Sequence, residues 1–242
     1  MIKKDNPLVV PISIIIAGGL IAIAIYLGGK SNQQYAAAPT NNNQQQQQQQ
    51  PQQPQQPNGQ VAPVTDKDNI VGSRDAKVII VEYSDSECPF CRSFHKTMLQ
   101  VVKEYKPSEV AWVYRQFPIA QLHPNAPKQS EAMYCANDLG GNKGFWSFTN
   151  RLFEVAGAGG PLDMNELPKI ASFAGLDTDA FNQCLSSGKF TKAVQDAVSA
   201  AGAAGAQGTP YSVAISKSGQ QLVISGAQPF EQVKSTIDSL LK

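Results

Sequence analysis

Two runs of apolar residues, separated by a helical pattern, stand out near the middle of the chain. Residues 78–81 are all β-branched, which is typical of a strand buried on both faces. After a polar stretch at 84–87, apolar residues recur at helical spacing from Phe90 to Tyr105. Residues 110–114 predict a second strand, which a helical crossover makes parallel to the first. The pattern therefore predicts a βαβ unit.

The C-terminal half of the chain has two further patterns. Residues 125–206 are rich in alanine, leucine and phenylalanine at helical spacings, with breaks such as the glycines at 140–141, and predict several helices in series. Short strands are predicted at 211–215 and 221–224, joined as a hairpin. A final amphipathic helix is predicted over 229–241. The order is βαβ, a helical block and ββα, so the predicted fold class is α/β.

An uncharged apolar stretch occupies residues 8–27. As a helix, about twenty such residues span the roughly 30 Å hydrocarbon core of a bilayer. A cleaved signal peptide is the alternative, since Lys3 and Lys4 precede the stretch, but the apolar core of such a peptide is usually only about 7–15 residues long. We expect an uncleaved, single-pass anchor in the cell membrane. The positive-inside tendency places residues 1–7 in the cytoplasm and the rest of the chain outside.

Composition changes abruptly after this stretch. Residues 28–63 are mainly glutamine, asparagine and proline with almost no large apolar side chains, which predicts a disordered linker because little surface can be buried to offset the ordering entropy. Residues 64–242 have the length of one domain with its own core. A net charge of +1 without any basic run gives no sign of nucleic-acid binding.

Four cysteines lie in this expected domain, and Cys88 and Cys91 are separated only by Pro89 and Phe90. Proline is favoured in the first turn of a helix, so Cys88 is expected at the helix N-terminus. There, unpaired N–H groups and the helix dipole stabilise a thiolate and lower the thiol pKa. Cys91, one turn later, is placed to attack a mixed disulfide formed by Cys88. The spacing predicts a nucleophile and a resolving thiol.

A metal site and a structural staple are the alternatives for this pair of cysteines. Zinc needs about four converging ligands, whereas Cys135 and Cys184 stand alone in the sequence. His95 follows Cys91 by one turn, but a histidine on an apolar helix face is more often a packing residue. We expect no metal and no bound cofactor. A purely structural role for the pair stays open at this point.

The CxxC pair at a helix start, the Gly-Thr-Pro at 208–210 before a strand and the order of elements resemble the DsbA-like branch of the thioredoxin superfamily. The resemblance covers roughly residues 75–242. It implies a thioredoxin fold with an inserted helical subdomain at about 125–206, and a cis peptide bond at Pro210 in a loop facing the cysteines. The backbone of Thr209 would then pair with an extended substrate, and Pro89 and Phe90 would contribute to substrate binding.

The resemblance also gives roles to three other residues. Glu82 matches an acidic position thought to move protons beneath the cysteines, and burial would raise the pKa of its carboxyl enough to accept the Cys91 proton. An exposed charge at the strand end is the alternative. Cys135 and Cys184 match a pair that forms a second disulfide in many relatives, with free buried cysteines as the alternative.

The function implied by the resemblance is that of an extracytoplasmic thiol–disulfide oxidoreductase. We expect an oxidase that donates the Cys88–Cys91 disulfide to folding secreted or membrane proteins and is re-oxidised by a quinone-linked membrane partner. A reductase or isomerase of the same fold is the first alternative. A non-enzymatic binding or chaperone module with a structural CxxC is the second. The client proteins and the oligomeric state are not predicted.

Three features near the cysteines bear on how strongly the pair oxidises. Phe90 stands where strongly oxidising relatives have a histidine, so the helix dipole and Arg92 or His95 would have to stabilise the thiolate. Asp85 and Glu87 would oppose a thiolate if they pointed at Cys88. The sequence does not indicate where these two carboxylates point.

Overall fold

The computed structural model describes residues 55–156 and 162–242. The predicted membrane anchor at 8–27 and most of the predicted linker lie outside these residues. Within the described ranges, no helix combines the length and apolar character that crossing a bilayer requires.

The described residues form a five-stranded sheet and its helices in an α/β fold, which confirms the predicted fold class. The elements in chain order are β1 (Asn69–Val71), β2 (Val78–Ser84), α2 (Pro89–Glu104), β3 (Val110–Gln116), α3 (Ala126–Val155), the short 3-10 helix η1 (Met164–Glu166), α4 (Leu167–Phe173), α5 (Thr178–Ser187), α6 (Thr191–Ala203), β4 (Tyr211–Ser216), β5 (Gln221–Ser225) and α7 (Phe230–Leu240).

The strands lie in the order β1-β3-β2-β4-β5, with β2 at the centre of the sheet. β2 and β3 pair in parallel, with Val81 opposite Val113, and the remaining pairs are antiparallel. Every residue of β2 except Ile79 is buried, as the β-branched run predicts. The central strand therefore brings its carboxyl end, and the loop that follows it, into the interior of the domain.

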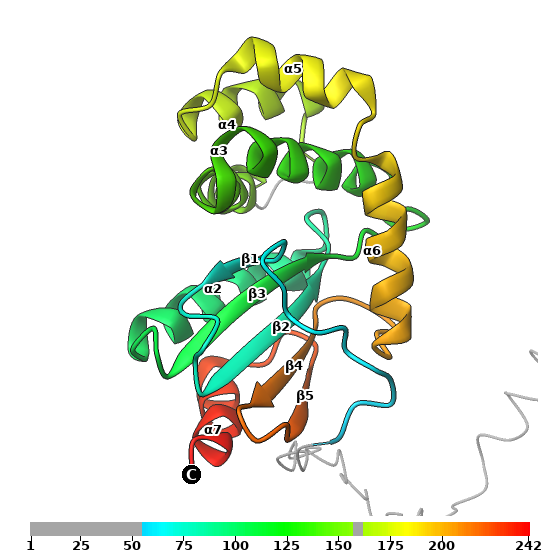
Figure 1. Ribbon diagram of the computed structural model, residues 1–242. Helices are drawn as coiled ribbons and strands as arrows, with labels where there is room; N and C mark the ends of the chain where they lie inside the picture. Colours follow the sequence, from blue (N-terminus) through cyan, green and yellow to red (C-terminus); the bar gives the residue numbers. More distant parts are fainter. Residues whose placement is uncertain (1–54, 157–161) are drawn as a thin grey trace, which may run out of the picture. The chain divides into compact units, whose positions relative to one another are not determined.

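Two apolar clusters sandwich the sheet. One joins α2, α7 and the helices of the insertion to one face, and its centre includes Phe94 and Trp112. The other joins the C-terminal end of α6 to the opposite face through Ala201 and Ala204. Figure 1 shows α3, α4 and α5 as a separate helical layer, from which α6 runs back toward the sheet. The sheet is thus covered on both faces.

Three details differ from the sequence predictions. β1 was not predicted, because its three residues are too few to show a period. The break expected at Gly140 and Gly141 is a kink at Gly141, where φ is 58°, inside one helical stretch. The predicted linker also extends too far, because residues 55–63 contact the domain and Val61 is buried in its core. Residues 55–63 are the last part of the predicted linker and the first residues that the structure describes.

Candidate active site

The site forms where β2 ends and α2 begins. Cys88 is the N-cap residue of α2, with an extended backbone (φ −68°, ψ 122°), and Pro89 follows at the start of the helix. The Arg92 N–H donates to the Cys88 carbonyl at 3.1 Å, which closes the first turn. Proline needs no acceptor at this position, so the sequence directs the helix to start here. The predicted placement of Cys88 is therefore present in the structure.

The two thiols have different surroundings. Cys88 is 5% exposed and Cys91 is fully buried, and both are free thiols. A hydrogen bond from the Cys91 side chain, helped by backbone N–H groups, lowers the pKa of Cys88 to about 5, although burial acts in the opposite direction. Burial, and then the neighbouring Cys88, raise the pKa of Cys91 well above its ordinary value. One thiol is a thiolate at neutral pH while its neighbour keeps its proton.

A loop from the far end of the domain covers this pair. The Thr209–Pro210 peptide bond is cis, as the resemblance implies. The Cys88 thiol lies within hydrogen-bond distance, 3.5 Å, of the Thr209 carbonyl oxygen. On the other side, the Asp85 N–H points at the Cys91 sulfur at 3.4 Å. The loop before β4 and the loop after β2 therefore enclose the two sulfur atoms.

Glu82 is fully buried in β2, which excludes an exposed charge at the strand end. The Trp112 indole N–H donates to its Oε2 at 2.8 Å. Burial raises the pKa of Glu82 to about 7, with the neighbouring Ser84 hydroxyl and the Trp112 indole acting in the opposite direction. The carboxyl can therefore both hold and release a proton near neutral pH.

Trp112 and Ser84 were missed as parts of this site by the sequence reasoning. Signals for both exist in the sequence. A buried tryptophan needs an acceptor for its N–H, and Trp112 lies on the strand expected to pair with the one that carries Glu82. Ser84 is two residues after Glu82, so the period of a strand places both side chains on one face. Ser84 is fully buried in the structure.

The two carboxylates close to Cys88 are held by a neighbouring loop. Asp85 accepts hydrogen bonds from the Ile119 N–H at 2.7 Å and from His123 Nδ1 at 2.9 Å. Glu87 accepts from the backbone and side-chain N–H groups of Asn125. Hydrogen-bond donors in residues 119–125 therefore bind both carboxylates, Asp85 and Glu87. His123 therefore helps to hold Asp85 in place.

His95 does not supply the charge that the sequence analysis assigned to it as one possibility. It is 2% exposed, stacks on Phe153 with ring centroids 4.4 Å apart, and Nε2 lies 2.9 Å from the Asn150 side-chain oxygen. Burial lowers the pKa of His95 to about 4, so the ring is neutral at pH 7. Among the described residues, no cluster of three or more potential metal ligands occurs.

Two other predictions concern the second pair of cysteines and the two residues between Cys88 and Cys91. Cys135 of α3 and Cys184 of α5 form a disulfide, with Cα atoms 5.9 Å apart, which ties these helices of the insertion together. Phe90, between the active cysteines, is 65% exposed. Pro89 is also exposed. Both residues are therefore available to a protein that approaches Cys88.

Comparison with known proteins agrees with this geometry. A family model described as Thioredoxin matches residues 64–239. The crystal structure of Pseudomonas aeruginosa DsbA2 has a TM-score of 0.58 and 27% sequence identity, over 71% of this chain and 93% of that one. Oxidised BdbD from Bacillus subtilis has a TM-score of 0.65 over 78% of this chain and 97% of that one, and its 19% identity supports the fold alone.

Two curated proteins give matches over part of their length. A Rickettsia felis protein named "Putative protein-disulfide oxidoreductase" is 25% identical over 160 residues, 59% of this chain and 52% of that protein. A Na(+)/H(+) antiporter NhaA 1 from Salinispora arenicola is 30% identical over 145 residues, 60% of this chain. The match spans only 21% of the antiporter.

Proposed function

The chain belongs to the Thioredoxin family, whose model matches residues 64–239, and on this basis we propose that it is a thiol–disulfide oxidoreductase that oxidises client proteins. The observation that carries the proposal is the contrast between the two thiols. The pKa of Cys88 is lowered to about 5 and that of Cys91 is raised well above its ordinary value. A disulfide with a purely structural role at the helix start would not need two thiols with such different pKa values.

The reaction exchanges one disulfide for another. A client thiolate attacks the Cys88 sulfur of the Cys88–Cys91 disulfide, and Cys91 leaves with the electron pair of the broken bond. Glu82, which is fully buried and has its pKa raised to about 7, gives Cys91 its proton. A second client thiolate then attacks the client sulfur of the mixed disulfide and displaces Cys88 as a stable thiolate. The client loses two electrons, and the cysteine pair gains them.

We place this reaction outside the cytoplasm. The Cys135–Cys184 disulfide supports that location, because such bonds persist in oxidising compartments. The apolar stretch at 8–27, preceded by Lys3 and Lys4, supports a membrane anchor with a cytoplasmic N-terminus. An anchored oxidase lies close to the membrane, where a quinone-linked partner would remove the two electrons. The clients are secreted or membrane proteins with reduced cysteines.

A reductase or isomerase is the second candidate function. Phe90 is uncharged, and His95 is neutral at pH 7 because burial lowers its pKa to about 4. A weaker stabilisation of the thiolate would make the Cys88–Cys91 disulfide a weaker oxidant. The two candidates differ in the form of the protein that accumulates during turnover.

The redox state of Cys88 in growing cells tests the proposed direction. Cells that express the full chain are quenched with acid, and free thiols are then alkylated with a reagent that shifts the protein on a gel. An oxidase is re-oxidised quickly, so we expect most of the protein to lack free Cys88 and Cys91 thiols. A mostly reduced pair at steady state would instead identify a reductase or isomerase.

A further inference from the structure

The segment that precedes the sheet, residues 55–68, lies against the domain as a strap. At its start, the Val223 N–H of β5 donates to the Gln55 carbonyl oxygen at 2.8 Å, and the two residues form an antiparallel bridge. The Gln60 N–H donates to the carbonyl oxygen of Ala203, the last residue of α6, at 2.9 Å. Figure 1 shows this segment passing beside β5 and the end of α6.

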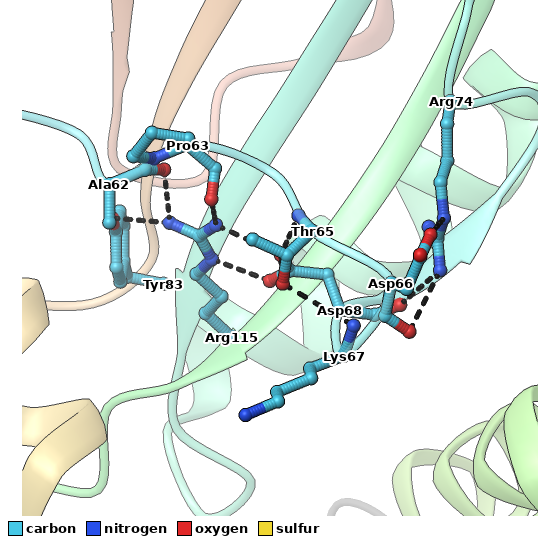
Figure 2. Close-up of polar contacts among 9 residues, drawn as sticks. All are labelled: Ala62, Pro63, Thr65, Asp66, Lys67, Asp68, Arg74, Tyr83 and Arg115. Atoms are coloured by element: carbon cyan, nitrogen blue, oxygen red, sulfur yellow. Dashed lines mark hydrogen bonds and ion pairs between the residues drawn. The ribbon is translucent and has the colours of Figure 1, made fainter.

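Arg115 of β3 holds the other end of the strap. Its guanidinium donates to both carboxylate oxygens of Asp68, at 2.8 and 3.2 Å. It also donates to the carbonyl oxygens of Ala62 at 2.9 Å and Pro63 at 3.1 Å, and to the Tyr83 hydroxyl at 3.2 Å (Figure 2). A guanidinium that binds a carboxylate through two parallel hydrogen bonds fixes the position of its partner and also stabilises the contact. The strap is therefore fixed at both ends.

Between these ends, Gly59 packs directly on the backbone at the end of α6. A Cβ atom at this position would lie 2.3 Å from the Ala203 carbonyl oxygen and 2.5 Å from the Gly205 nitrogen. Those are backbone atoms, so any side chain at residue 59 forces the strap away from the helix. The close approach requires glycine.

The strap forms one wall of a pocket of about 350 Å³. Gln55, Gln56 and Asn58 line this wall, and Gln207, Thr209 and Pro210 of the cis-proline loop lie among the residues of the pocket's other walls. Thr209 belongs to the pocket and also lies against the nucleophile, since its carbonyl oxygen is 3.5 Å from the Cys88 sulfur. The Thr209 side chain also hydrogen-bonds Cys88 and helps to lower the pKa of that thiol. Thr209 therefore links the pocket to the reacting sulfur.

We propose that this pocket binds the client polypeptide next to its reacting cysteine, and that the strap is a specificity-determining part of the enzyme. The inference rests on the proposed function and names how that site holds its substrate. A client bonded to Cys88 must pass Thr209, and an extended chain advances only about 3.3 Å per residue, so the residues beside the cysteine are those that reach the pocket.

The chemistry of the pocket fits an extended peptide. The side-chain amides of Gln55, Gln56, Asn58 and Gln207 each donate and accept hydrogen bonds, as a peptide backbone does. The pairing of Gln55 with Val223 also occupies part of the outer edge of β5. A client is therefore kept from adding to that edge as a strand and is directed into the pocket instead.

Gly59→Ala in the full chain tests the proposal, with Gly202→Ala as the matched control. A Cβ at Gly202 meets nothing within 4 Å, so this α6 variant leaves the strap in place. Oxidation of a reduced dithiol peptide is compared with oxidation of dithiothreitol, which is too small to reach the pocket. We expect Gly59→Ala to lower the ratio of the two kcat/KM values about tenfold, chiefly through a higher KM for the peptide, as expected for one or two lost hydrogen bonds. Gly202→Ala should leave the ratio unchanged.

A second variant, with Gln56→Ala and Asn58→Ala combined, removes wall side chains without displacing the backbone. It should lower the same ratio about fivefold, which keeps the proposal testable if Gly59→Ala folds poorly. An unchanged ratio in this folded double variant would overturn the proposal. Failure of the unaltered chain to oxidise dithiothreitol would instead contradict the proposed function, so the two failures are distinguishable.

Discussion

Replacing Cys88 with serine is expected to abolish disulfide transfer to a reduced peptide, leaving only the uncatalysed rate. Cys88 is the more accessible of the two thiols, it lies against the cis-proline loop, and its pKa is lowered to about 5. A serine hydroxyl forms no disulfide, so neither the Cys88–Cys91 disulfide that a client thiolate attacks nor the mixed disulfide is available. The measurement is peptide oxidation by the full chain after treatment with an oxidant.

The companion variant, Cys91→Ser, is expected to behave differently. In the reverse exchange the Cys88 thiolate can still attack a client disulfide and form a mixed disulfide. Cys91, which would release the client from that bond, is missing, so complexes with clients should accumulate and appear on non-reducing gels. The double variant provides the control, since it should trap nothing. Unchanged peptide oxidation in the Cys88→Ser variant would remove the proposed mechanism.

Removing the second disulfide should have the largest effect on stability. Cys135 and Cys184 are 49 positions apart in the sequence. Closing a loop of that length restricts the unfolded chain and stabilises the folded state by about 4 kcal/mol on the chain-entropy model. We expect the variant with Cys135→Ala and Cys184→Ala to lose about that much free energy of unfolding in guanidinium titrations.

The double replacement is preferable to a single one, because a single change would leave a reactive thiol that could pair with Cys88 or Cys91. The loss should lie in stability and not in chemistry, since this disulfide joins α3 to α5, whereas the active thiols contact Asp85 and Thr209. A free energy of unfolding within about 1 kcal/mol of the unaltered chain would show that the helical insertion keeps its arrangement without the bond.

The strands and helices with a clear hydrophobic period could be predicted from the sequence, and so could the residues at their ends. The β-branched run at 78–81, the helical spacing after Phe90 and the proline at position 89 together place Cys88 at a helix start, as observed. Local rules of this kind operate over a few residues, so no knowledge of distant contacts is needed.

Features that depend on distant contacts were not predictable in the same way. His95 was considered as a source of positive charge, but aromatic rings from β3 and α3 enclose it and make the ring neutral. The strap was assigned to a disordered linker by its composition. It is held by Arg115, which lies in a strand far along the chain, and by the close approach that Gly59 permits. Neither contact leaves a local pattern.

The reduction potential of the Cys88–Cys91 pair tests the central claim most directly. The full chain is equilibrated with mixtures of reduced and oxidised glutathione, quenched with acid and alkylated to count free thiols. Because the thiolate of Cys88 is stabilised, its pKa being about 5, we expect the reduced form to be favoured and the disulfide to be a strong oxidant. We predict a potential less negative than about −200 mV, and a more negative value, toward the roughly −270 mV of thioredoxin, would contradict an oxidase.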